Sequence, residues 1–272
     1  MGYSNGIVYF IDILGSKNRN FDDSLKIHNI FNKELADTNK KKYYLEPFGK
    51  KHVTSFSDCA YILYIIENEF NTEEMFLSFI FDSLFNTANI IAFFSMNGFH
   101  CRGGISSGEV YFDKEKNILF GPAVTKSYLL EQEAKMPRII FDDALAKKLI
   151  KYDKEKKKKD EFAKILNGSI IIKDKMDHRY YLNYLNCLTR RKTIGLGGHL
   201  YNVDEYYAIL KMDLQKALRK EKNHEVIAKI NWQLNYLEAQ WQDNKKRQRF
   251  SDSELLDLYL RSKSNNNVQN GA

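Results

Sequence analysis

Two short motifs near the start of the chain each place an aspartate in or beside an apolar run. The first, F-I-D-I-L-G, covers residues 10–15 with Asp12 at its centre, and the second, S-F-S-D-C-A, covers residues 55–60 with Asp58. A carboxylate in a buried strand is costly unless something cationic neutralises it. Two of them, on strands that lie side by side, would create a shared site for divalent metal ions.

The residue types indicate which metal such a site would hold. The two proposed ligands are carboxylates with no His or Cys expected nearby, and hard oxygen ligands favour Mg²⁺ or Mn²⁺ over Zn²⁺. Mg²⁺ held by only two carboxylates usually takes its remaining ligands from water and substrate phosphates. The pair therefore points to nucleotide chemistry.

An arginine on a third predicted strand adds a cation to this picture. Arg102 lies in C-R-G-G-I-S-S-G at residues 101–108, and a planar guanidinium offers fixed donors to phosphate oxygens. Taken alone, Asp12 could be a satisfied core carboxylate and Asp58 a turn cap. Together with Arg102, the two aspartates are better explained as parts of one site.

The hydrophobic pattern predicts the elements that would position these residues. Strands are expected at 7–13, 53–56, 60–66, 101–112, 118–120 and 139–141, and helices at 21–37, 71–91, 122–134 and 142–149. Asp58 would then lie in the turn between two strands. The order strand, helix, strand, strand, helix, strand is the split β-α-β pattern of ferredoxin-like folds. We therefore expect an α/β (α+β) fold.

A lysine-rich run at 154–159 is predicted to mark a boundary in the chain. We expect a catalytic domain over residues 1–150 and a C-terminal extension over 151–262. The extension would contain a small hairpin, 169–172 with 180–184, and a helix through the apolar stripe at 226–241. The tail, 263–272, is expected to be disordered.

Charge and composition limit the classes of partner. The net charge of +7 is concentrated in basic runs at 154–159 and 244–249, and such runs are usually solvated faces. An RNA-binding sheet would show basic residues alternating with aromatic residues that stack on bases, and this pattern is not evident in the sequence. No apolar stretch is expected to reach the length of a membrane span, and the first residues do not resemble a signal peptide. We therefore expect a cytoplasmic protein without a stable nucleic-acid or membrane partner.

Four motifs in order resemble those of class III nucleotidyl cyclases, the superfamily of adenylyl and guanylyl cyclases. Within it, the chain is most similar to the bacterial pyrimidine cyclases of the Pycsar anti-phage systems. The motifs are F-I-D-I-L-G at 10–15, S-F-S-D at 55–58, C-R-G-G-I-S-S-G at 101–108 and F-G-P-A-V-T-K-S-Y-L-L-E at 120–131, followed by P-R-I at 137–139. The match covers the first half of the chain, and Y-L-N-Y-L at 181–185 also resembles this subfamily. The resemblance implies a cyclase catalytic fold built on a ferredoxin-like sheet.

The resemblance also implies a role for each matching residue. Asp12 and Asp58 match the metal-binding aspartates, which hold two Mg²⁺ or Mn²⁺ ions per active site. Ile13 matches a position that ligates metal through its carbonyl, and Arg102 matches an arginine that contacts the triphosphate. Three further positions match the turn whose backbone amides meet the phosphates: Leu14, Gly15 and Ser16. Catalysis would thus depend on Asp12, Asp58 and Arg102.

Four positions depart from the purine-cyclase pattern. The base-reading Lys of adenylyl cyclases is replaced by Thr54, and the second base-reading residue, an Asp, by Ile118. The transition-state Asn and Arg correspond to Thr125 and Leu129. These differences count against adenylyl cyclase activity and less against a pyrimidine cyclase, because that subfamily departs from the purine pattern too. Thr54 is expected to face the base.

Two charged residues in the same segment are given ordinary interpretations. Lys126 lies near the position of the missing arginine, but a solvated lysine on a helix is the better interpretation. Glu131 is likewise interpreted as a charge on the helix surface.

The sequence thus predicts a homodimeric cyclase that converts UTP to 3′,5′-cyclic UMP and pyrophosphate. The product would be a second messenger for anti-phage defence, sensed by a separate effector. Alternatives stay open: a cytidylate cyclase that uses CTP, a catalytically dead cyclase-fold module that binds nucleotide for regulation, and a polymerase-like palm, which also carries two metal-binding aspartates.

Overall fold

The computed structural model describes residues 2–15, 19–40, 49–66, 72–166, 168–196 and 198–269. Ser16, which the resemblance assigns to a phosphate-binding turn, lies outside the described residues. The chain separates into two compact units. The first comprises Met1–Leu149 with Ile171–Leu182, and the second comprises Ile150–Ile170 with Asn183–Ala272.

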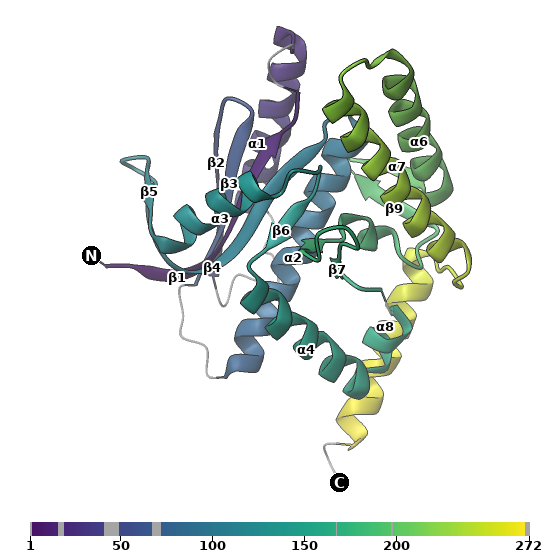
Figure 1. The fold of residues 1–272 in the computed structure, drawn as a ribbon. Coiled ribbons are helices and arrows are strands. Elements are labelled where there is room, and N and C mark those ends of the chain that lie inside the picture. Colours follow the sequence, from purple (N-terminus) through teal and green to yellow (C-terminus); the bar gives the residue numbers. More distant parts are fainter. Residues whose placement is uncertain are drawn as a thin grey trace. The chain divides into compact units, whose positions relative to one another are not determined.

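The first half of unit 1 follows the predicted order of strands and helices (Figure 1). Its elements are β1 (Ser4–Ile13), α1 (Phe21–Lys40), β2 (Gly49–Phe56), β3 (Cys59–Ile66), α2 (Glu73–Met96) and β4 (Cys101–Asp113). The sheet order β2-β3-β1-β4 is antiparallel throughout. This is the strand order of a ferredoxin-like sheet, and the predicted α/β fold class is confirmed.

The remaining elements of unit 1 extend this sheet beyond β4. They are β5 (Ile118–Phe120), α3 (Pro122–Glu133), β6 (Ile139–Phe141), α4 (Asp143–Lys159, which runs on into unit 2), β7 (Ile171–Lys173) and β8 (Tyr180–Leu182). β6 pairs in parallel with β4, and β8 pairs with β6 through Ile140 and Tyr181. The hairpin that the sequence analysis places in the C-terminal extension therefore belongs to the sheet of unit 1.

A buried cluster of ion pairs stabilises the contact between this hairpin and the segment that precedes β6. Arg138, which precedes β6, pairs with Asp174 and Asp177 of the loop between β7 and β8. Its guanidinium also lies over the ring of Tyr181, 5.7 Å from the centroid. Because the arginine side chain is almost fully buried, its charge requires these carboxylates. The contacts join segments that are 36 and 39 residues apart in the chain.

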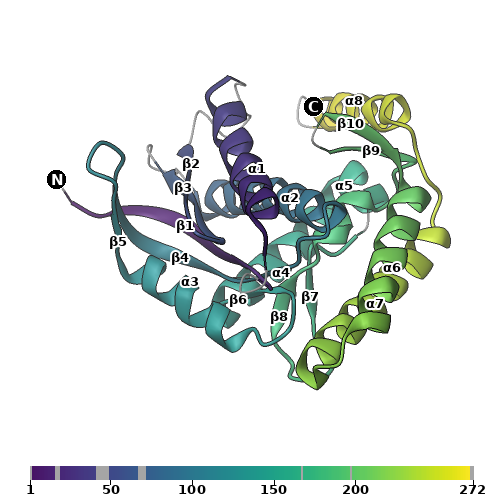
Figure 2. The ribbon, with the colours of Figure 1, turned by 90° about the horizontal axis from the view of Figure 1, so that it is seen from above.

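The two faces of the sheet pack against different helices (Figure 2). On one face, the fully buried Tyr9 of β1 lies 2.6 Å from the hydroxyl of Ser83 on α2. On the other face, α3 packs directly on β4, where Ser106 donates a hydrogen bond to the carbonyl of Ala123. A Cβ at Gly104 would lie only 2.5 Å from the Cβ of Leu130. Glycine at that position therefore lets α3 approach the sheet closely.

The apolar composition of α2 contradicts the expectation that no segment is long enough to span a membrane. Contrary to the expectation from sequence, this helix is long and apolar enough to cross a membrane by length and composition. However, 56% of its apolar window is buried inside the structure, and core helices of soluble proteins pass the same test. The packing of α2 on the sheet accounts for its composition.

Unit 2 contains mainly helices. Its elements are α5 (Glu161–Leu166), the 3₁₀ helix η2 (Tyr184–Leu188), β9 (Thr193–Leu196), β10 (His199–Asn202), α6 (Val203–Lys220), α7 (His224–Lys245) and α8 (Asp252–Gln269). The helix predicted from the stripe at 226–241 is α7. The sequence analysis does not predict α6, although Asn202 caps its first turn by accepting from the amide of Asp204.

Two further boundaries expected for the C-terminal half differ from the structure. The helix expected at 142–149 runs on through the lysine run at 154–159 and ends at Lys159, because lysine is a good helix former. The tail expected to be disordered from residue 263 is helical through Gln269 in α8, since propagation of an existing helix needs no new nucleation. Residues 270–272 lie outside the described residues.

Candidate metal and phosphate site

The strand register places Asp12 between two polar neighbours. Asp12 of β1 lies opposite Cys59 of β3 on one side and opposite Arg102 of β4 on the other. Residues directly opposite each other in an antiparallel sheet point to the same face. The three side chains therefore share the face on which α3 packs.

A tight turn adds the second aspartate to this group. β2 and β3 are joined by Ser57 and Asp58, as the sequence analysis predicts, and Ser57 has a positive φ of 53°. The amide of Ile13 donates to the carbonyl of Asp58 at 3.0 Å. This bond fixes the turn beside the end of β1, so that both predicted aspartates come together.

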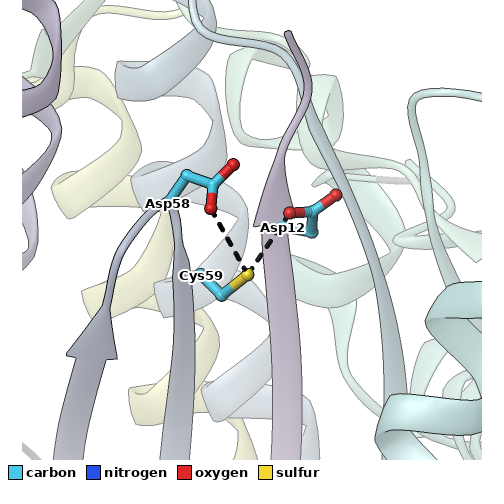
Figure 3. Close-up of side chains that lie close together, drawn as sticks. All are labelled: Asp12, Asp58 and Cys59. Atoms are coloured by element: carbon cyan, nitrogen blue, oxygen red, sulfur yellow. Dashed lines mark hydrogen bonds between the residues drawn. The ribbon is translucent and has the colours of Figure 1, made fainter. Parts of the chain in front are cut away.

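The two carboxylates and a thiol form a compact cluster (Figure 3). The ligand atoms of Asp12, Asp58 and Cys59 all lie within 4.8 Å of one another. The Sγ of Cys59 lies 3.3 Å from Oδ1 of Asp12 and 3.9 Å from Oδ1 of Asp58. The expectation of a site without cysteine is therefore wrong, because Cys59 is part of the cluster. Its position directly after Asp58 in the sequence could have identified it.

The donor set of this cluster fits a divalent cation bound through oxygen. Burial and the neighbouring Asp12 carboxylate raise the pKa of Cys59, so the thiol stays neutral and donates to the carboxylates instead of acting as a thiolate ligand. Two carboxylates that are neither fully buried nor fully exposed then remain as the anionic ligands. Such ligands suit Mg²⁺ or Mn²⁺ better than a thiolate-seeking metal.

Arg102 bridges this cluster and a carboxylate on α3. One guanidinium nitrogen, Nη2, lies 3.3 Å from Oδ2 of Asp12 and also pairs with Oε1 of Glu131. Burial raises the pKa of Glu131, while the charge of Arg102 opposes the shift. The interpretation of Glu131 as a surface charge is wrong, because only 4% of its side chain is exposed. Helical spacing from the buried Ser127 and Ala134 could have placed it on the packed face.

The amides of the turn after β1 are only partly available for a phosphate. The Leu14 amide, one of the three predicted phosphate-binding groups, donates to the carbonyl of His100 at 2.9 Å. Gly15 has a positive φ of 87° and is exposed. The Leu14 amide thus already has an acceptor, whereas Gly15 lies at the surface.

An arginine that the sequence analysis does not single out holds the carbonyls of the same turn. Nη2 of Arg19 donates to the Leu14 carbonyl at 2.7 Å and lies 3.4 Å from the Ile13 carbonyl. Its guanidinium carbon also lies 5.8 Å from the centroid of the Phe99 ring. The Ile13 carbonyl, which the resemblance assigns to the metal, is thus next to a cation in this structure.

Thr54 lies on the same face of the sheet as Asp12. It pairs with Tyr61 of β3, which in turn lies opposite Phe10 of β1. The rings of Tyr61 and Phe10 are 4.7 Å apart. The half-buried threonine hydroxyl therefore lies on an aromatic part of the sheet, two residues along β2 from Phe56, which pairs with Cys59.

The residues in the transition-state positions of the cyclase pattern lie on the outer side of α3. Thr125 is exposed, and 53% of Leu129 is exposed. Lys126 forms an ion pair with Asp142, the residue that caps the first turn of α4 by accepting from the amide of Leu145. In this structure Lys126 thus pairs with a carboxylate at the start of α4.

Comparisons with known proteins find similarity only at the level of solved structures. No family model matches the chain, and no curated protein matches it. One similar structure is the catalytic core of a rhodopsin-guanylyl cyclase with converted specificity in complex with ATPαS, with 13% identity, a TM-score of 0.40 and coverage of 67% of this chain and 97% of that one.

Two other structures show comparable similarity. A bacterial light-regulated adenylyl cyclase is 16% identical with a TM-score of 0.37, over 68% of this chain and 92% of its own. The guanylate cyclase domain of RhGC from Catenaria anguillulae, in complex with GTP, is 14% identical with a TM-score of 0.38, over 67% and 98%. These low scores do not assign a function, which must come from the residues of the site itself.

Proposed function

We propose that this protein is a nucleotidyl cyclase that acts on a pyrimidine nucleoside triphosphate, with UTP as the substrate and CTP as the alternative. The observation that carries the proposal is the convergence of Asp12, Asp58 and Arg102 at one end of the sheet. Two carboxylates for divalent cations and one guanidinium for phosphate oxygens are the groups that triphosphate chemistry requires. The four motifs that resemble those of class III cyclases support the same assignment.

Each residue of the site then has a defined task. Asp12 and Asp58 would hold two Mg²⁺ or Mn²⁺ ions, with the Ile13 carbonyl as a further ligand. The bound ions supply polarisation of the phosphates and a lower pKa for the ribose 3′-hydroxyl. Arg102 would bind the β- and γ-phosphates and balance the charge that grows on them. The thiol of Cys59 orients the Asp12 carboxylate through their contact at 3.3 Å.

The reaction forms one bond and breaks one. The ribose 3′-oxygen bonds to the α-phosphorus as its proton leaves to water, and the bond from the α-phosphorus to the bridging oxygen of the β-phosphate breaks. The products are the 3′,5′-cyclic monophosphate and pyrophosphate. Gly15 and Ser16 would bind phosphate oxygens through their amides, and the Leu14 position would contribute only if its bond to His100 opened.

Thr54 is the proposed contact for the base. A small hydroxyl donates or accepts one hydrogen bond and leaves room that a lysine would fill. Its neighbours on the same face, Tyr61 and Phe10, provide flat apolar surface. The proposal does not assign the group that distinguishes uracil from cytosine. UTP is favoured over CTP on the resemblance alone.

A homodimer is the proposed assembly, with two equivalent sites. Large apolar side chains are exposed on β2, β5 and α3 of unit 1: Phe56, Ile118, Phe120, Tyr128 and Leu129. Exposed apolar side chains of this size are available to an interface, and contiguous apolar surfaces are typical of interaction sites. Because Phe56 lies across β3 from Asp12 on the same face, a second copy of the chain would cover the site and complete it.

The biological part of the proposal follows from the resemblance. The cyclic nucleotide would be a second messenger made in the cytoplasm during phage infection and sensed by a separate effector protein. A catalytically dead regulatory module is the second candidate function. The exposed Thr125 and Leu129 in place of a transition-state Asn and Arg favour it.

One assay separates these functions. Purified protein is incubated with each of the four ribonucleoside triphosphates and Mn²⁺, and products are identified by mass. We expect cyclic UMP from the wild type and a loss of at least about a hundredfold in Asp58→Asn, because even residues outside the metal ligands often cost 10–100-fold. Asp153→Asn, which removes a carboxylate paired with Lys157 in unit 2, is the control and should retain full activity.

Other outcomes of the same assay identify the alternatives. Cyclic CMP as the main product would make the protein a cytidylate cyclase. If no product forms, nucleotide binding measured separately by calorimetry would indicate the dead regulatory module. Extension of a primer, in a parallel reaction that contains primer and template, would indicate a polymerase. A wild-type rate in Asp58→Asn would contradict the proposed mechanism in every form.

A further inference from the structure

Arg102 is held between two carboxylates that belong to different elements. The Nη2 nitrogen contacts Oδ2 of Asp12 on the neighbouring strand at 3.3 Å and pairs more closely with Oε1 of Glu131 on α3. The Arg102 side chain is 26% exposed and that of Glu131 only 4%. One cation therefore has an anionic partner inside the metal cluster and a second partner outside it.

The position of Glu131 results from the close packing of α3 on β4. A Cβ at Gly104 would lie 3.0 Å from the amide nitrogen of Glu131, so the helix backbone rests on the strand that carries Arg102. An ion pair is an expensive choice for so buried a position, because replacing both partners with apolar side chains of similar volume often gives equal or greater stability. Stability alone therefore gives little reason for the pair of Arg102 and Glu131.

The contact between Arg102 and Asp12 creates a conflict with metal binding. A divalent ion held by Asp12 would take a carboxylate that a guanidinium already touches, and two cations so close repel each other. If Asp12 were the only anion within reach, Arg102 would compete with the metal. Glu131 offers the guanidinium another anion, which comes from α3 and not from the turn that carries Asp58.

We propose that Glu131 is a positioning residue that keeps Arg102 from competing for Asp12. Glu131 holds the guanidinium on the α3 side of the site, so that Asp12 is available to a divalent cation while Arg102 stays aimed at the phosphates. This inference rests on the proposed function, since it assumes the metal site formed by Asp12 and Asp58.

The test measures Mn²⁺ binding in the absence of nucleotide. Free Mn²⁺ is followed by electron paramagnetic resonance during titration of wild type, Glu131→Gln, Arg102→Gln and the double variant. Glu131→Gln should weaken Mn²⁺ binding on the order of fivefold, within the range of coupled sites, because Arg102 then turns to Asp12. Arg102→Gln should strengthen Mn²⁺ binding, because it removes the competing cation.

The double variant gives the decisive comparison. With Arg102 already replaced, Glu131→Gln should change Mn²⁺ affinity much less than it does in the wild type. An equal loss in both backgrounds would show that Glu131 acts through its own charge or through the fold, and it would overturn the proposal. Unchanged affinity in Glu131→Gln would do the same.

Two controls keep the test interpretable. Glu133→Gln removes a carboxylate from the same helix, but this one is exposed and pairs with Arg179, so Mn²⁺ affinity should not change. If Glu131→Gln does not fold, Arg102→Gln alone decides: affinity equal to or weaker than wild type overturns the proposal. The titrations measure Mn²⁺ binding and not turnover, so they test this inference separately from the proposed activity. If Glu131→Gln weakens Mn²⁺ binding only when Arg102 is present, the inference is supported even if the protein makes no cyclic nucleotide.

Discussion

At the scale of single residues, His100 contributes a backbone contact at the site and a buried ring that affects stability. Its carbonyl accepts the Leu14 amide at the end of β1, and Arg102 follows two residues later on β4. Desolvation lowers the pKa of His100 to about 4. The folded protein therefore keeps this imidazole neutral at a pH at which an unfolded chain protonates it.

This shift predicts how stability depends on pH. Between pH 6.5 and about 4 the unfolded state binds the additional proton, so the free energy of unfolding falls as the pH is lowered through this range. We expect His100→Gln to lose less stability than the wild type between pH 7 and pH 5, as measured by urea unfolding. His199→Gln, a change at an exposed position, should follow the wild type. Identical pH slopes for all three proteins would show that the ring is not desolvated.

At the scale of elements, the close contact of α3 with β4 decides the geometry on one side of the site. Gly104 has no side chain, and Leu130 and Glu131 occupy the adjacent space on the helix. Phe10 of β1 and Tyr128 of α3 also meet across this contact, with ring centroids 5.5 Å apart. A shift of α3 would move Glu131 away from Arg102.

Gly104→Ala tests this packing. The added methyl would meet Leu130 and the carbonyl of Ser127, and overpacking of this kind typically costs about 1–3 kcal/mol. We expect a lower urea midpoint and, because α3 carries Glu131, weaker Mn²⁺ binding. Gly195→Ala is a suitable control in another strand, since a Cβ there meets nothing within 4 Å. Stability unchanged from wild type in Gly104→Ala would indicate that α3 does not pack as described.

At the scale of the whole molecule, β2, β5 and α3 each expose large apolar side chains. We propose that a second copy of the chain covers them. Phe120→Arg places a charge on β5 at a position that is 47% exposed, so the isolated fold should tolerate it. We expect sedimentation to show a dimer for the wild type with UTP and Mn²⁺ and a monomer with strongly reduced cyclase activity for the variant.

A matched substitution on another surface controls for the added charge. Met212→Arg changes a residue that is 67% exposed on α6 of unit 2, and it should leave both the dimer and the activity intact. A wild-type protein that sediments as a monomer with nucleotide and metal present would contradict the homodimer. Full activity from a monomeric Phe120→Arg would show that one copy completes the site alone.

The sequence by itself determined the parts of this protein that depend on local pattern. The apolar runs around Asp12 and on either side of Ser57 and Asp58 predicted strands. The two polar residues, Ser57 and Asp58, predicted the turn that joins β2 to β3. Strand period, helix period and turn chemistry are properties of neighbours in the chain. Their order was enough to predict the ferredoxin-like sheet, and together with the resemblance to class III cyclases it led to the proposal that Asp12, Asp58 and Arg102 form one site.

Only the tertiary structure decided which groups meet across long separations. Arg102 and Asp12 are 90 residues apart, and the buried partner Glu131 comes from a helix whose contact with β4 no local pattern specifies. The hairpin at 171–182 likewise joins the sheet through a single pairing of Tyr181 with Ile140. Periodicity tells which side of an element is buried but not what covers it, because that depends on register and packing set by the folded chain as a whole.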